Sequence, residues 1–213
     1  SEDELGLTPL FYAAVHGSSS SVVRALLDAH SEAASRSERY YGKIPLHVAT
    51  DAEVARELLD AYPRGVGRRN VLGHVPLHKA AASAEAGPEL VRLLVRRGKE
   101  AEEKRRRKGR DAAASEVGGV AGEDDDDDEC GDVGPLPGGG ALAGDVNGKT
   151  PLDYLCEKIV QRTGSTANGP GGEEAATTTM EPLTGSGLRY WEKLVAIAEE
   201  VVPPPPSPSP ASP

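Results

Sequence analysis

The chain has 213 residues and a formal net charge of −10, a length that suits one or two ordinary domains and a charge that disfavours general nucleic-acid binding. Aromatic residues make up only 4%, while Gly (25) and Pro (17) are frequent, so we expect an aliphatic core and some segments outside it. The sequence shows no apolar run that approaches a membrane span and no Cys-x-x-Cys pair. We therefore expect an intracellular protein, cytoplasmic or nuclear, without a disulfide framework.

One short phrase occurs four times along the chain, as TPLF at 8–11, IPLH at 44–47, VPLH at 75–78 and TPLD at 150–153. In each copy a Gly stands three residues before the Pro, and Asp3, Arg39, Asn70 or Asp145 stands three residues before that Gly. This spacing predicts a tight turn and then a helix start, because Gly allows positive φ and Pro fits the first helical position. The recurring motif comprises Thr8, Pro9, Leu10, Pro45, Leu46, His47, Pro76, Leu77, His78, Thr150, Pro151 and Leu152.

A longer amphipathic helix is predicted after each of the first three helix starts. The segments are SVVRALLDAH at 21–30, AEVARELLDAYP at 52–63 and GPELVRLLVRRG at 87–98. Their apolar residues recur at the three- and four-residue spacing of one helix face. We expect Ser20 or Ser21 to cap the first helix, Pro63 to stop the second and Gly98 to end the third.

Two departures from a uniform repeat carry structural expectations. The second copy is four residues shorter between its Pro-Leu and Leu-Leu pairs, so its first helix or connecting turn must be clipped. Ile44 and Val75 replace the Thr of the other copies, so those two helix starts lose a side-chain cap worth about 1 kcal/mol each.

Residues 1–98 therefore form three repeats, and residues 99–144 interrupt the pattern. The interruption contains KRRRKGR, EDDDDDE and a Gly-rich stretch, and carries a net charge of −6; we predict a disordered charged insertion. Residues 145–202 resume as a degenerate fourth repeat with an internal loop at 163–187, followed by a disordered Pro/Ser-rich tail at 203–213. The last helix is expected to have an apolar face of Leu188, Trp191, Val195, Ala198 and Val202.

A turn, a short helix and a longer helix, repeated at about 33 residues, resemble the ankyrin repeat family. The family phrase Thr-Pro-Leu-His-x-Ala is matched by IPLHVA and VPLHKA, and more loosely by TPLFYA and TPLDYL. The resemblance covers residues 1–98 well and 145–202 loosely. It implies an all-α solenoid with short hairpin-like turns, in which His47 and His78 hydrogen-bond neighbouring backbone rather than ligate a metal.

The resemblance also implies a protein–protein interaction module that grips another protein through its turn tips and first-helix surface. We expect no catalysis, cofactor, metal, small-molecule substrate, membrane or nucleic-acid partner, and a monomer. Tyr40 and Tyr41 are the expected centre of binding, because tyrosine is enriched at binding hot spots. The variable positions that would contact the partner are Glu4, Leu5, Leu7, Val15, His16, Tyr40, Tyr41, Lys43, Val71, Leu72, His74, Val146, Asn147 and Lys149.

Two other readings of the sequence stay open. The chain could be a regulatory ankyrin segment of a larger enzyme or channel. It could also be a nuclear factor whose KRRRK stretch serves as an import signal, which would involve Lys104, Arg105, Arg106, Arg107 and Lys108.

Overall fold

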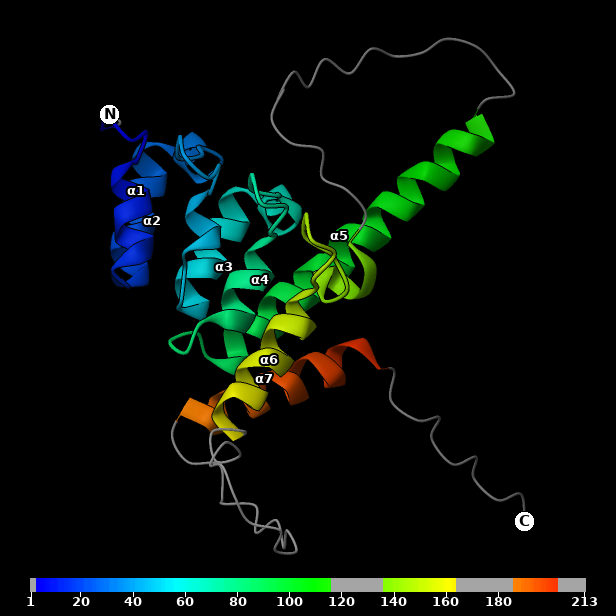
Figure 1. Ribbon diagram of the computed structural model, residues 1–213. Helices are drawn as coiled ribbons and strands as arrows, with labels where there is room; N and C mark the ends of the chain where they lie inside the picture. Colours follow the sequence, from blue (N-terminus) through cyan, green and yellow to red (C-terminus); the bar gives the residue numbers. More distant parts are fainter. Residues whose placement is uncertain (1–2, 116–135, 164–185, 203–213) are drawn as a thin grey trace, which may run out of the picture.

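The computed structural model describes residues 3–115, 136–163 and 186–202, and these form helices joined by turns, with no strand among them. Figure 1 shows the chain passing from the blue helix pair at its N-terminal end to the orange-red helix at the other. The EDDDDDE run, most of the predicted loop 163–187 and the tail 203–213 lie outside the described residues. The α-helices are α1 (Pro9–Val15), α2 (Ser20–Ala29), α3 (Ala52–Ala61), α4 (Pro76–Ala82), α5 (Pro88–Ser115), α6 (Pro151–Thr163) and α7 (Ser186–Val201); the 3-10 helices are η1 (Ser31–Ala34), η2 (Pro45–His47), η3 (Pro63–Gly67) and η4 (Pro137–Gly140).

The helices stack in two layers, which confirms the predicted all-α repeat solenoid. The first helices of the repeats, α1, η2, α4 and α6, contact one another in chain order, and so do the second helices, α2, α3, α5 and α7. One repeat could not bury its apolar face alone, whereas stacked neighbours bury a continuous aliphatic core. That core includes Leu10, Leu58, Leu77, Leu94, Leu155 and Ile197.

The predicted turns precede the first helices. Gly6, Gly42, Gly73 and Gly148 have φ values of 76°, 66°, 75° and 77°. Side chains with a Cβ adopt this left-handed conformation at a cost, so the turn itself requires Gly at a fixed distance before each Pro.

The second repeat has the clipped first helix that its length predicts. Its first helix, η2, has only three residues, whereas α1 and α4 have seven each. Asp51 then starts α3 by accepting hydrogen bonds from the backbone N–H groups of Glu53 and Val54 at 2.8 and 3.1 Å. The expected cap of α2 is wrong, because α2 begins after Ser19, whose side chain makes no capping hydrogen bond.

Gly98 does not end its helix, contrary to the expectation from the sequence. Instead α5 continues to Ser115 and extends past the stacked helices (Figure 1). The residues after Gly98 are strong helix formers, and the ion pairs Glu102–Arg106 and Glu103–Arg107 span one helical turn each. Gly98 serves a different purpose: a Cβ at this position would overlap the carbonyl oxygen of Gly139, so its absence lets η4 approach the helix.

Residues 136–144 pack against α5, so the predicted disordered insertion is structured at both of its ends. The backbone N–H of Leu136 donates to Glu102 Oε2 over 3.3 Å. Leu136, Ala141 and Ala143 are buried in the core. In chain order η4 follows α5 as η1 follows α2 and η3 follows α3. The third repeat therefore resumes at Leu136, before the turn that begins at Asp145.

The last helix, α7, packs on α5 and α6 as a second helix of the fourth repeat should. The predicted contact face is wrong, since Leu188, Trp191, Val195, Ala198 and Val202 are exposed. Both sides of this helix carry apolar residues, so periodicity alone does not decide which side faces the core. The buried side consists of Tyr190, Lys193, Ala196 and Ile197.

Lys193 is fully buried where α7 meets α4. Its ammonium donates to the carbonyl oxygen of Ala80 at 2.8 Å and to that of Ser83, and it lies 5.1 Å from the ring centroid of Tyr190. The C-terminal end of a helix favours a cation because its last carbonyl groups are unpaired. Burial lowers the pKa of Lys193 to about 8.

Two further features of the described helices are the position of Cys156 and whether any helix could span a membrane. Cys156 is exposed on α6 and does not contribute to the core. Among the described helices, none has both the length and the apolar character needed to span a membrane.

Candidate functional site

Each turn is organised by one Asp, Asn or Glu side chain that accepts hydrogen bonds from the turn's own backbone. Asp145 Oδ1 accepts from the N–H groups of Asn147 and Lys149 at 2.7 and 2.9 Å. Asp3 and Asn70 make the equivalent pair of bonds in their turns. The sequence pattern puts Arg39 at the equivalent position of the second turn, but Arg39 is not the residue that accepts these hydrogen bonds. Instead, Glu38, one residue earlier, accepts from the N–H groups of Tyr40, Tyr41 and Lys43.

Backbone hydrogen bonds join each turn to the next. The N–H of Arg39 donates to Leu5 O at 3.1 Å, that of Val71 to Tyr41 O at 2.8 Å, and that of Val146 to Leu72 O at 3.1 Å. The last bond joins the third and fourth turns although a long segment of chain separates them. The four turn tips therefore stand in one hydrogen-bonded row.

The two motif histidines also tie neighbouring repeats together, as the family resemblance implied. His47 Nδ1 accepts from the N–H of Ile44 at 3.3 Å, and Nε2 lies 2.9 Å from the carbonyl oxygen of His74 in the next turn. His78 makes the same contacts with the N–H of Val75 and the carbonyl oxygen of Lys149. Both rings are therefore neutral donors at Nε2. Burial lowers the pKa of His47 to about 4, and burial lowers that of His78 as well.

The helix starts differ in their caps. Thr8 Oγ1 accepts from the N–H of Phe11 at 3.2 Å. Thr150 and Asp153 form a reciprocal capping box, which gives a reason for Asp where two other copies have His. Ile44 and Val75 are fully buried and make no capping hydrogen bond, as predicted for these two positions.

The row of turn tips displays apolar side chains to solvent. Tyr40 is 70% exposed, Val71 67%, Val146 66% and Tyr41 51%. An exposed row of this kind typically marks an interaction surface. The other predicted contact residues lie on the same tips or on the end of α1: Glu4, Leu5, Val15, His16, Leu72, Asn147 and Lys149 are exposed, and Leu7, Lys43 and His74 are half-buried.

A cavity of about 240 Å³ lies beside this row; we call it the tip cavity. Its walls come from the second and third turns, from η2 and α4, and from α6, so it spans three repeats. Sequence reasoning missed Val48, Lys79, Ala82 and Tyr154, because it assigned contact positions mainly to the turns. The residues that line it are Tyr41, Lys43, His47, Val48, Asn70, Leu72, His74, His78, Lys79, Ala82 and Tyr154.

A polar cluster forms the part of this wall that joins the third and fourth repeats. Tyr154 Oη donates to Asp145 Oδ2 at 2.8 Å, and His74 Nε2 lies 3.3 Å from the same oxygen. Burial raises the pKa of Asp145, but hydrogen bonds from Tyr154, from the turn backbone and from His74 outweigh it and lower the pKa to about 2. The ionised carboxylate thus holds a proton on His74 Nε2. His74 Nδ1 has no hydrogen-bond partner among the described residues.

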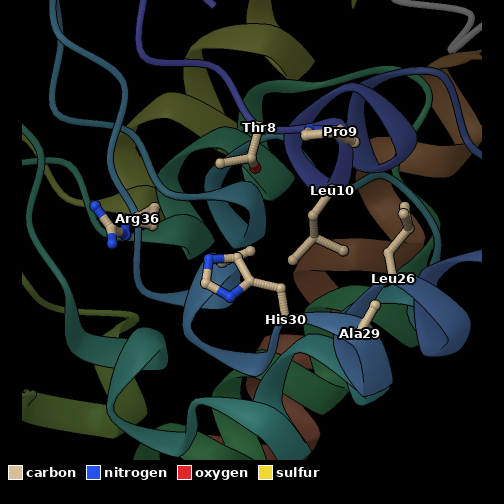
Figure 2. A pocket seen from close by; sticks show the side chains of 8 residues that line it. Thr8, Pro9, Leu10, Leu26, Ala29, His30 and Arg36 are labelled. Atoms are coloured by element: carbon tan, nitrogen blue, oxygen red, sulfur yellow. The ribbon is translucent and has the colours of Figure 1, made fainter. Parts of the chain in front are cut away.

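A second cavity of about 510 Å³ lies at the first repeat, between α1, α2 and the segment after η1. In Figure 2, the His30 ring lies between Arg36 on one side and Leu10 and Leu26 on the other, with Thr8 above it. Most of its lining is apolar, and the Thr8 hydroxyl already caps α1. None of the predicted contact residues lines it.

The basic stretch at 104–108 lies on the exposed extension of α5 rather than in a loop. Arg106 and Arg107 pair with Glu102 and Glu103 on the same helix, so acidic neighbours offset part of its charge. Its use as an import signal stays a prediction.

Comparisons with known proteins point to one family. The family model of the ankyrin repeat matches residues 5–37. No curated protein and no solved structure matches the chain significantly. The match covers the first repeat, which is neither clipped like the second nor interrupted like the third. Among the described residues, no group of three or more His, Cys, Asp or Glu side chains could hold a metal ion.

Proposed function

We propose that this chain, which belongs to the ankyrin-repeat family, binds a partner protein through its row of turn tips and the tip cavity. Ankyrin repeats are generally protein-binding modules and typically not catalytic. The observation that carries the proposal is the exposed apolar row, in which each tip is bonded to the next. Because this surface is already ordered, little conformational entropy is lost when a partner binds to it.

Tyr40 and Tyr41 are the proposed centre of this surface. Both rings are more than half exposed, and neither belongs to the buried core. The Lys43 ammonium lies 4.5 Å from the centroid of the Tyr41 ring, and both side chains line the tip cavity. A partly ordered aromatic ring with a polar end combines large contact area with little rotamer entropy.

The test is a binding measurement on the Tyr40→Ala/Tyr41→Ala double variant. The partner is first captured from the native cell with the full chain, and its affinity is then measured with purified proteins. We expect a loss of about 2 kcal/mol or more, roughly a thirtyfold weaker Kd, with the melting temperature nearly unchanged.

The matched comparison is Trp191→Ala, which removes an exposed aromatic ring from the outer face of α7. It should leave the affinity within about twofold of the wild type. If Trp191→Ala abolishes binding while the tyrosine variant does not, the partner binds the end of the solenoid and the proposal is wrong.

A further inference from the structure

We infer that the tip cavity takes an apolar side chain of the partner that is flanked by carboxylates, so the bound segment is both acidic and apolar. This inference rests on the proposed function and adds the chemistry of the partner. Three features of the cavity support it: its unpaired lysines, its available imidazole nitrogen, and its size and apolar walls.

The tip cavity is lined by lysines that have no carboxylate partner among the described residues. Its lining includes Lys43 and Lys79 but no Asp or Glu. Among the described residues, neither lysine has a carboxylate within ion-pairing distance, and the Lys43 ammonium instead lies over the Tyr41 ring. The second-helix layer differs, since Arg24, Arg92 and Arg97 each pair with a carboxylate of a neighbouring helix. In a chain of net charge −10, two lysines without partners at one cavity mark a site for an incoming carboxylate.

His74 adds a hydrogen-bonding group to the same site. Its Nε2 faces the ionised Asp145, and its Nδ1 has no partner among the described residues. With its Nε2 proton directed at Asp145, the ring can accept a hydrogen bond at Nδ1 from a backbone N–H of the bound segment. The neighbouring Lys149 already pairs with Glu157 at 2.6 Å, so it is not counted as available.

The apolar walls and the volume favour a peptide side chain over a free metabolite. Val48, Leu72, Ala82 and the ring of Tyr41 supply apolar surface. The cavity measures about 240 Å³, below the roughly 300 Å³ at which small-molecule pockets begin. Because Tyr41 and Leu72 belong both to the cavity and to the exposed row, a segment lying along the tips can insert one side chain here.

The experiment uses the full chain as bait for an unbiased library of short random peptides displayed on phage. The enriched sequences are read, and one is synthesised for affinity measurement. We expect Asp or Glu on either side of a Leu, Ile, Met or Phe, and an affinity that falls as salt is raised.

Two charge-reversal variants of equal net charge separate the site from a general electrostatic effect. Lys43→Glu/Lys79→Glu should weaken the peptide at least about tenfold, equivalent to about 1.4 kcal/mol. Lys104→Glu/Lys108→Glu changes the exposed extension of α5 instead and should leave the affinity within about twofold. Circular dichroism melts establish that both variants fold.

A third variant tests the apolar part of the site without changing charge. Ala82→Leu adds a side chain to the cavity wall on a helix that tolerates Leu, so it should also weaken the peptide. Enriched peptides that are basic or uncharged, or that bind the Lys43→Glu/Lys79→Glu variant as well as the wild type, would overturn the inference. If those peptides still need Tyr40 and Tyr41, the proposed function stands; if no enriched peptide depends on the tyrosines or the lysines, both fail.

Discussion

Gly98 shows how one residue can be required for packing although its position suggests a helix stop. It lies inside α5, where Gly costs about 1 kcal/mol relative to Ala. A Cβ on Gly98 would overlap the backbone of Gly139, and one on Gly139 would overlap the carbonyl oxygen of Val95. The two glycines therefore allow η4 to lie against the helix backbone.

We predict that Gly98→Ala destabilises the protein by about 1–3 kcal/mol, because overpacking outweighs the gain in helix propensity. The measurement is denaturant unfolding of the variant and the wild type. Gly87→Ala is the matched control, since a Cβ at Gly87 would meet open space, and it should be neutral or slightly stabilising. A stabilised Gly98→Ala variant would show that η4 does not pack on α5.

His47 gives the protein a stability that depends on pH. Its folded-state pKa of about 4 lies below the usual value of 6.5, so between these values the unfolded state binds a proton that the native state does not. The contribution of His47 is therefore complete above about pH 6.5 and is lost as the pH falls toward about 4, by about 3 kcal/mol in total.

The comparison variant is His47→Gln, which keeps hydrogen-bonding capacity but cannot titrate. The free energy of unfolding should fall less steeply for this variant than for the wild type between about pH 7 and about pH 4. Below about pH 4 the two curves should run parallel, because His47 is then protonated in both the folded and the unfolded state, and the stability lost as Asp145 is protonated toward about pH 2 is common to both proteins. Curves that run parallel above that pH as well would mean that His47 is accessible to solvent and protonates in the folded state.

At the level of whole elements, local signals in the sequence predicted most of the fold. The Gly-x-x-Pro spacing predicted the turns and helix starts, and a count of residues predicted the clipped η2. These features follow from backbone conformation within a few residues of the motif. The exposed positions of the turn tips follow from the same spacing, whereas the partner contacts assigned to them stay a prediction.

The wrong predictions concern elements whose conformation depends on contacts with residues distant in the sequence. The part of α5 after Gly98 and residues 136–144 pack against each other. Both were missed because the blocks of charged residues in this part of the sequence are typical of a disordered segment. The buried side of α7 was missed because Lys193, placed there by two carbonyl groups of the third repeat, reads as a surface residue. Tyr154 was missed because it reaches the tip cavity from α6 rather than from a turn. A Pro shortly before the turn is a signal for η4, since Pro137 precedes Asp145 much as Pro63 precedes Asn70.

The element after the interruption leads to a third prediction. Leu136→Ala should cost about 2–5 kcal/mol, because its buried side chain packs where the third repeat resumes. Replacement of 116–135 by a Gly/Ser segment of the same length should leave the melting temperature within a few degrees, since it spares every core residue described. Thermal melts measure both changes. If the replacement of 116–135 destabilises the protein more than Leu136→Ala does, the folded unit includes part of 116–135.

The whole molecule is neutral over residues 1–98 and acidic after them, yet its solenoid is continuous. The bonds from Val146 to Leu72 and from His78 to Lys149 hold the fourth repeat in register with the third. Together with the α5–α7 ion pair of Arg92 and Glu199, they make both layers continuous across the interruption. We therefore expect all four turn tips to contact one partner together.

Hydrogen–deuterium exchange of the chain with and without its captured partner tests this surface most directly. We predict that binding slows amide exchange at the tips around Tyr40, Tyr41 and Leu72 and at Val146, and in α4 beside the tip cavity, while α2 and α3 stay unchanged. Protection confined to the outer face of α7 or to the α5 extension, with the tips unchanged, would contradict the account.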